Sequence, residues 1–221
     1  VARDNFEFAQ ITTEQMLSEI NNINSKKIET FLDIPSKILK KSADIVVNFL
    51  TDVWNEKIVR QNTFPDELKL AELTPIFKKD DSTLAKNYRP VSVLPYISKI
   101  FERIMQKQIA EYIECFLSQF LCGYRKGYNT QIALMGLIEK LEKALDQKSF
   151  AGAILMDLSK AFNTIDYDLL ISKLNAYRFG IKSIKILRNY LSNRWQRTKI
   201  NNSFSTWSLI LKGPQGSLFG P

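Results

Sequence analysis

The sequence predicts a helix-rich fold of the α+β class, with α/β as the alternative, in one large domain or two small ones. Several segments of its 221 residues have apolar side chains at helical spacing, two alternate like strands, and one short segment is apolar throughout. Apolar residues make up 45% and charged residues 24%, which is typical of a chain that buries a core.

Helices are expected first over residues 12–24 and 35–59. Thr12 and Gln15 have the spacing of a capping box at the start of the first helix. A proline opens the second helix, where its missing N–H costs nothing, and a break at residues 62–65 ends it.

The middle of the chain combines one strand with two helices. Residues 71–78 alternate like a strand but contain Pro75, which predicts an edge or bulged strand. Helical spacing follows over residues 97–117 and 132–145. The basic, glycine-bounded residues 123–127 between them predict a loop.

The last third begins with a short apolar run. Residues 150–156 predict a central strand that is buried on both faces. Two helices are expected next, over residues 167–178 and 182–192. Residues 196–200 and 204–211 then read as a hairpin.

Composition excludes several classes of function. The sequence contains no histidine, which rules out Ser-His-Asp and Cys-His hydrolases and every zinc site that uses histidine. Two cysteines, Cys115 and Cys122, are too few for a disulfide framework and favour reduced thiols in an intracellular protein. Because there is no signal peptide and no apolar run of about 18 residues, no membrane insertion is expected.

The positive charge is concentrated near the C-terminal end. The formal net charge is +8. Residues 151–221 contain ten basic and three acidic side chains, whereas residues 1–150 are nearly balanced. This distribution favours a polyanionic partner.

Two local patterns could carry chemistry. Asp157 ends the apolar run, where a carboxylate can hold a hard cation such as Mg²⁺, or can simply cap the next helix. The Gly/Pro-rich residues 213–221 could bring backbone and the Gln215 amide close to a ligand, or form an ordinary turn.

A third pattern is basic. Arg89 follows Lys78 and Lys79 by about ten residues, and clustered cations of this kind suit phosphate groups. Each lysine taken alone fits a solvated surface equally well.

In their order along the chain, five segments resemble the reverse transcriptase domain of non-LTR (LINE-type) retrotransposons. They are PIFKK (75–79), NYRPVSVLPYISKIFERIM (87–105), CGYRKGYNTQIAL (122–134), LMDLSKAFNTIDYDLL (155–170) and GPQGSLFGP (213–221). The resemblance begins near residue 64, and the residues before it resemble the N-terminal extension of the family.

The resemblance implies a right-hand polymerase that copies RNA into DNA by two-metal phosphoryl transfer. Residues 1–63 would be a helical extension, residues 64–150 fingers-like, and residues 151–221 an incomplete palm, with the thumb absent. Its partners would be an RNA template, a DNA primer and a dNTP. Its cofactor would be two Mg²⁺ ions, and its compartment would be the nucleus.

Family motifs assign roles in the palm. Asp157 would bind both Mg²⁺ ions, with the Leu158 carbonyl as a further ligand. Phe162 would lie under the incoming sugar and exclude a 2′-hydroxyl, although core packing explains a phenylalanine there as well. Gln215 would line the nucleotide pocket.

Other roles fall in the fingers. Arg89 would contact the triphosphate, assisted by either Lys78 or Lys79. Arg125 and Lys126 would lie in a region that contacts the template.

The resemblance also predicts that this chain is inactive by itself. The family's Tyr-x-Asp-Asp turn, which supplies two further metal-binding carboxylates, is absent from the 221 residues, so the chain is expected to be an N-terminal fragment of the domain. Asn163 also stands where the family commonly has aspartate. The alternative is a non-catalytic nucleic-acid-binding remnant of a decayed element.

Overall fold

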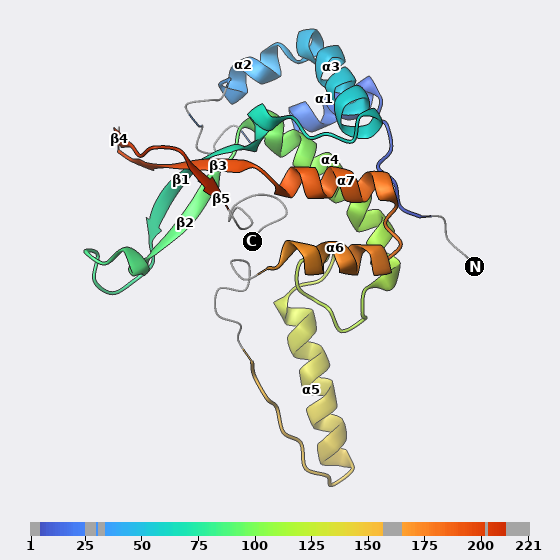
Figure 1. Cartoon of the computed structure of the whole chain (residues 1–221). Coiled ribbons are helices and arrows are strands. Elements are labelled where there is room, and N and C mark those ends of the chain that lie inside the picture. The colour runs from blue at the N-terminus through green and yellow to red at the C-terminus, as the bar shows by residue number, and fades with distance from the viewer. Residues whose placement is uncertain (1–4, 25–29, 31–33, 157–164, 202, 211–221) are drawn as a thin grey trace. The chain divides into compact units, whose positions relative to one another are not determined.

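The computed structural model describes residues 5–24, 30, 34–156, 165–201 and 203–210 (Figure 1). The chain forms two compact units. The first combines Val1–Tyr112 with Lys160–Pro221, and the second is Ile113–Ser159.

Four helical segments open the first unit. They are α1 (Thr13–Asn21), α2 (Ser36–Lys41), α3 (Ala43–Asp52) and the π-helical segment η1 (Val53–Arg60). The capping box is confirmed: the Thr12 hydroxyl accepts from the Gln15 amide, and the Gln15 side chain accepts from the Thr12 amide. The helix expected from residue 35 is present but divides at Ser42, whose hydroxyl donates to the Ile38 carbonyl.

A mixed sheet forms the other part of this unit. Its strands are β1 (Leu70–Phe77), β2 (Tyr88–Val93), β3 (Arg194–Ile200), β4 (Ser203–Phe204) and β5 (Ser208–Ile210). The order is β2-β1-β3-β4, with β5 also paired to β3. Only the β1–β3 pairing is parallel among the described strands. The sheet and the dominant helices confirm the coarse prediction of a helix-rich α+β fold.

The position of β1 differs from the prediction. An edge or bulged strand was expected because of Pro75, and the edge position is wrong because β1 lies between β2 and β3. The proline is tolerated because pairing with β3 covers only Leu70–Leu73, so Pro75 lies beyond it. Strand β2, which contains Pro90, was not predicted and owes its formation to pairing with β1.

The first unit also contains two short 3-10 turns, η2 (Asp66–Lys69) and η3 (Ala85–Asn87). Three further helices belong to it: α4 (Tyr96–Ile113), α6 (Tyr167–Ala176) and α7 (Ile181–Leu191). All three helices lie where the apolar spacing predicted them. Their apolar faces meet the N-terminal helices in one core around Trp54, Phe64, Phe101 and Tyr190. This core joins segments from both ends of the chain, so α7 packs beside helices more than a hundred residues earlier (Figure 1).

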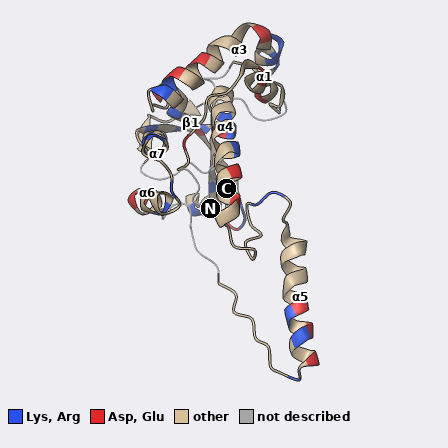
Figure 2. Ribbon diagram, turned by 90° about the vertical axis from the view of Figure 1, so that its right-hand side faces the viewer, with Lys and Arg blue, Asp and Glu red and all other residues tan. Residues whose placement is uncertain are grey.

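The second unit contains one long helix, α5 (Thr130–Asp146), preceded by the 3-10 turn η4 (Glu114–Phe116). Asn129 caps α5 by accepting from the Ile132 amide. The charged residues of α5 all lie in its second half (Figure 2). Helix α5 confirms the helix that the apolar spacing predicted over residues 132–145.

The central strand predicted over residues 150–156 is wrong. These residues form no regular secondary structure, and Ile154, Leu155 and Met156 are each about nine-tenths exposed. A buried strand requires neighbouring strands to pair its backbone groups, and none of the described strands pairs with this run. The division of the chain at residues 63 and 150 stays a prediction.

Candidate nucleic-acid interface

The β1–β2 hairpin determines which basic side chains lie together. Ile76 is directly opposite Arg89, and the Lys78 amide donates to the Asn87 carbonyl at 2.9 Å, which extends the ladder by one pair. Because residues two apart on a strand share a face, Lys78 and Arg89 lie on the same face, whereas Lys79 lies in the bend beyond the last paired residues. All three side chains are exposed.

A hydrogen-bonded turn holds the tip of this hairpin. The Asp81 carboxylate accepts from the Thr83 amide at 2.8 Å and from the Thr83 hydroxyl at 2.7 Å, and these bonds lower the pKa of Asp81. The Tyr88 hydroxyl donates to the Ser82 carbonyl at 2.8 Å. The turn therefore orients the strand that carries Arg89.

The face that carries Arg89 continues across the sheet to β3. Glu72 of β1 lies opposite Val93 on one side and opposite Arg197 on the other. Glu72 is 2% exposed, and its carboxylate accepts two hydrogen bonds from the Arg197 guanidinium. The acidic group on this face is thus buried and paired.

Aromatic rings gather beside this pair. The Arg197 guanidinium lies 4.0 Å from the ring centroid of Phe204 and 4.9 Å from that of Trp207. Sequence reasoning missed this cluster, although the alternation Trp195-Gln-Arg197-Thr-Lys199 contained the signal. The register of β3 against β1 is what brings these residues onto the face of Arg89.

Arg125 and Lys126 of the second unit were predicted to contact the template. Arg125 is held by local contacts. Its guanidinium donates to Glu114 at 2.8 Å and to the Ser118 carbonyl at 3.1 Å, and it lies 4.3 Å from the Tyr128 ring centroid. The bond to Glu114 raises the pKa of Arg125. These contacts organise the loop before α5, while Lys126 is exposed.

The palm residues of the prediction, Asp157, Leu158, Phe162 and Gln215, lie outside the described residues. Within the described ranges, no group of three histidine, cysteine or acidic side chains could hold a metal ion. Likewise, none of the described helices is long and apolar enough to cross a membrane.

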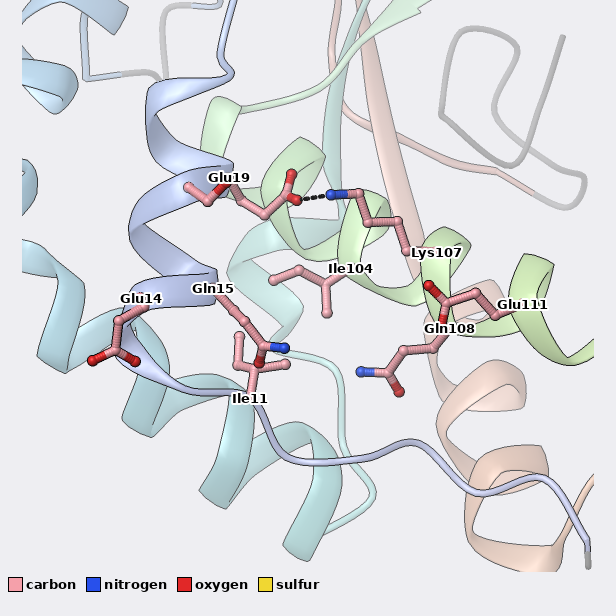
Figure 3. Close-up of a pocket in the computed structure, with 9 residues that line it drawn as sticks. Ile11, Glu14, Gln15, Glu19, Ile104, Lys107, Gln108 and Glu111 are labelled. Carbon is pink, nitrogen blue, oxygen red and sulfur yellow. Dashed lines mark hydrogen bonds and ion pairs between the residues drawn. The ribbon is translucent and has the colours of Figure 1, made fainter. Parts of the chain in front are cut away.

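A pocket of about 450 Å³ lies between α1 and α4 in the first unit (Figure 3). Glu14, Glu19 and Glu111 line it, with Lys107 as the basic side chain among the lining residues. Because acidic groups outnumber the cation, the pocket does not suit a triphosphate or a phosphate backbone.

The comparisons identify the family. Residues 76–221 match the model of the family described as reverse transcriptase (RNA-dependent DNA polymerase). That match covers well over half of the chain, and the chain belongs to this family.

Its relatives come from retrotransposons of the non-LTR, LINE-like type. The chain is 27% identical over 215 residues to a probable RNA-directed DNA polymerase from transposon BS of Drosophila melanogaster, covering 96% of this chain and 24% of the relative. It is 32% identical over 182 residues to the corresponding protein of the X-element from the same species, covering 78% and 19%. A third relative, the RNA-directed DNA polymerase from mobile element jockey of Drosophila funebris, is 25% identical over 217 residues, covering 96% and 23%. The chain spans about a fifth to a quarter of the length of these relatives.

Proposed function

We propose that this chain contributes the nucleotide-binding fingers and the first part of the palm to an RNA-directed DNA polymerase. The observation that carries this proposal is the register of the β1–β2 hairpin within the matched family region, which puts Lys78 and Arg89 on one exposed face. By the proposed division, the fingers are residues 64–150, the palm begins at residue 151, and residues 1–63 are a helical extension.

The two hairpin cations suit a dNTP triphosphate. Arg89 offers a planar fork of donors for paired phosphate oxygens, and Lys78 adds a point charge from the diagonal position. Two cations on one face neutralise part of the triphosphate charge and orient its chain of phosphates. Lys79 lies in the bend beyond the paired residues and is left out of the proposed site.

The proposed metal chemistry belongs to the palm. Asp157, with the Leu158 carbonyl, would hold Mg²⁺, which in this class of reaction stabilises the attacking and leaving oxygens. Phe162 would select deoxynucleotides and Gln215 would line the nucleotide pocket.

The proposed partners are an RNA template and a DNA primer. Arg125 and Lys126 remain candidate template contacts, with Lys126 the more accessible of the two. Template copying at chromosomal sites would place the protein in the nucleus.

The hairpin assignment predicts a difference between the two lysines. Arg89→Ala and Lys78→Ala are each expected to weaken dNTP binding to the chain about tenfold, as loss of a charge-assisted hydrogen bond does. Lys79→Ala is the matched control and is expected to change the affinity less than about twofold. Isothermal titration with a dNTP measures this, and an equal loss for both lysines would contradict the register argument.

The chain alone is not expected to extend a primer on an RNA template. Its 221 residues contain Asp157 but no Tyr-x-Asp-Asp motif, so the carboxylates for a two-metal site are incomplete. Extension assays with Mg²⁺ and dNTPs test this, and extension that Asp157→Ala abolishes would overturn the expectation. The second candidate function, nucleic-acid binding without catalysis, predicts RNA binding with no response to dNTPs.

A further inference from the structure

One face of the sheet combines exposed aromatic rings with cations. We call it the aromatic–cation face and define it by Trp195, Arg197, Lys199, Phe204 and Trp207. The three β3 residues alternate along the strand and therefore share a face. Phe204 lies opposite Lys199, and Trp207 contacts Arg197.

The rings of this face are accessible. Trp195 is 42% exposed, Phe204 40% and Trp207 37%. Three large aromatic side chains on one sheet face are more than the scattered apolar residues of an ordinary surface. Rings that stay exposed in this way offer flat surfaces for a planar ligand.

The charges around the rings are mainly positive. The five strands contain one acidic side chain, Glu72, which is buried against Arg197. Lys199 lies 5.6 Å from the Phe204 ring centroid, and Arg89 lies on the same face two strands away. An anionic chain lying across the sheet would meet Lys199 and Arg89 with no exposed strand carboxylate opposing it.

These features match single-stranded nucleic acid. Unpaired bases stack on aromatic rings and on guanidinium planes, while phosphates meet cations between them. A duplex hides its base faces inside the stack and could use only the cations. An apolar protein partner would have to bury the Lys199 ammonium beside the rings at a cost in desolvation.

We propose that the aromatic–cation face binds a single-stranded nucleic acid by base stacking. The inference that bases stack on this face depends only on the five residues that define it. The further inference that the strand is unpaired template depends on the proposed function. The face would then continue the surface of Arg89 and guide the strand across β3 and β5.

Tryptophan fluorescence provides a direct test. The chain has three tryptophans; Trp54 is fully buried, whereas Trp195 and Trp207 lie on the proposed face. Titration with a single-stranded RNA of about ten nucleotides is expected to quench the emission, because the bases stack on the exposed indoles. DNA of the same sequence tests whether the strand can be either nucleic acid, and binding of both supports the stacking.

Variants separate stacking from charge. Trp207→Ala is expected to weaken binding of the RNA about tenfold, whereas Trp207→Phe keeps a ring and stays within about threefold. Phe49→Ala removes an exposed ring elsewhere and is the matched control. Lys199→Gln is expected to reduce the slope of log affinity against log salt by about one.

Three results would overturn the proposal. One is that the RNA leaves the tryptophan emission unquenched, and another is that the chain binds duplex and single-stranded RNA with equal affinity. The third is that Trp207→Ala and Phe49→Ala reduce the affinity for RNA equally. Sedimentation that shows the chain dimerising through this face, with Trp207→Ala restoring the monomer and no RNA binding, would also overturn it. Circular dichroism of each variant checks the fold, and the fluorescence titration of the unchanged chain together with Lys199→Gln decides the matter if Trp207→Ala unfolds. Trp207→Ala is expected to leave dNTP binding unchanged, so failure here is distinguishable from failure of the hairpin site, which Arg89→Ala reports.

Discussion

Replacing Trp54 by alanine is expected to destabilise the first unit by about 3–5 kcal/mol, which is a large share of the stability of a domain. The side chain is fully buried, and its ring lies 5.9 Å from that of Phe101 and 6.4 Å from that of Phe8. Its indole N–H donates to the Ala9 carbonyl at 3.1 Å. Alanine would leave a cavity among α4, η1 and the N-terminal segment, and would leave that carbonyl without the indole donor.

Urea denaturation followed by far-ultraviolet circular dichroism measures this loss. Phe49→Ala is the control: it removes a ring that is 68% exposed on the neighbouring helix α3, and should change stability by about 0.5 kcal/mol or less. Trp54→Phe should recover part of the loss because it refills most of the cavity. A loss below about 1 kcal/mol for Trp54→Ala would show that this ring does not lie in the main core.

Removing both cations that pair with Glu19 is the second change with a large expected effect. Glu19 of α1 has a side chain that is 5% exposed, and its carboxylate accepts from Arg103 of α4 at 3.2 Å. It also accepts from Lys107 of the same helix (Figure 3). The double variant Arg103→Met/Lys107→Met leaves a buried carboxylate beside two apolar chains. We expect it to lose about 3 kcal/mol of unfolding free energy.

A third substitution distinguishes charge from packing. Glu19→Leu in the double-variant background removes the uncompensated carboxylate and should recover most of the lost stability, because apolar replacement of a buried ion pair is often neutral or better. Thermal or urea unfolding of the single, double and triple variants completes the cycle. If the triple variant is no more stable than the double, packing of the long side chains accounts for the loss instead of charge.

The helices illustrate what local sequence could predict. The spacing of apolar residues placed α4, α5, α6 and α7, because the period of a helix is visible within a few turns of local sequence. The Thr12 capping box was predictable for the same reason: both of its hydrogen bonds join residues three apart.

The strands show where this reasoning failed. Pro75 suggested an edge or bulged strand, yet its strand lies between two others. Residues 150–156 suggested a buried strand, yet they pair with none of the described strands. A strand depends on partners that are distant in sequence, so its own residues cannot tell how many partners it has.

The same distinction applies to the candidate site. From its sequence alone, this chain could be placed in a family of reverse transcriptases. Its basic character and the candidate residues Lys78, Lys79 and Arg89 could also be identified. All of these conclusions depend only on residue types and their order. Only the tertiary structure decided that Lys78 shares a face with Arg89, that Arg125 is held by Glu114, and that Arg197 lies among aromatic rings. The physical reason is register: pairing between β1 and strands up to 125 residues away determines which alternate side chains meet on one face, and no local pattern records that pairing.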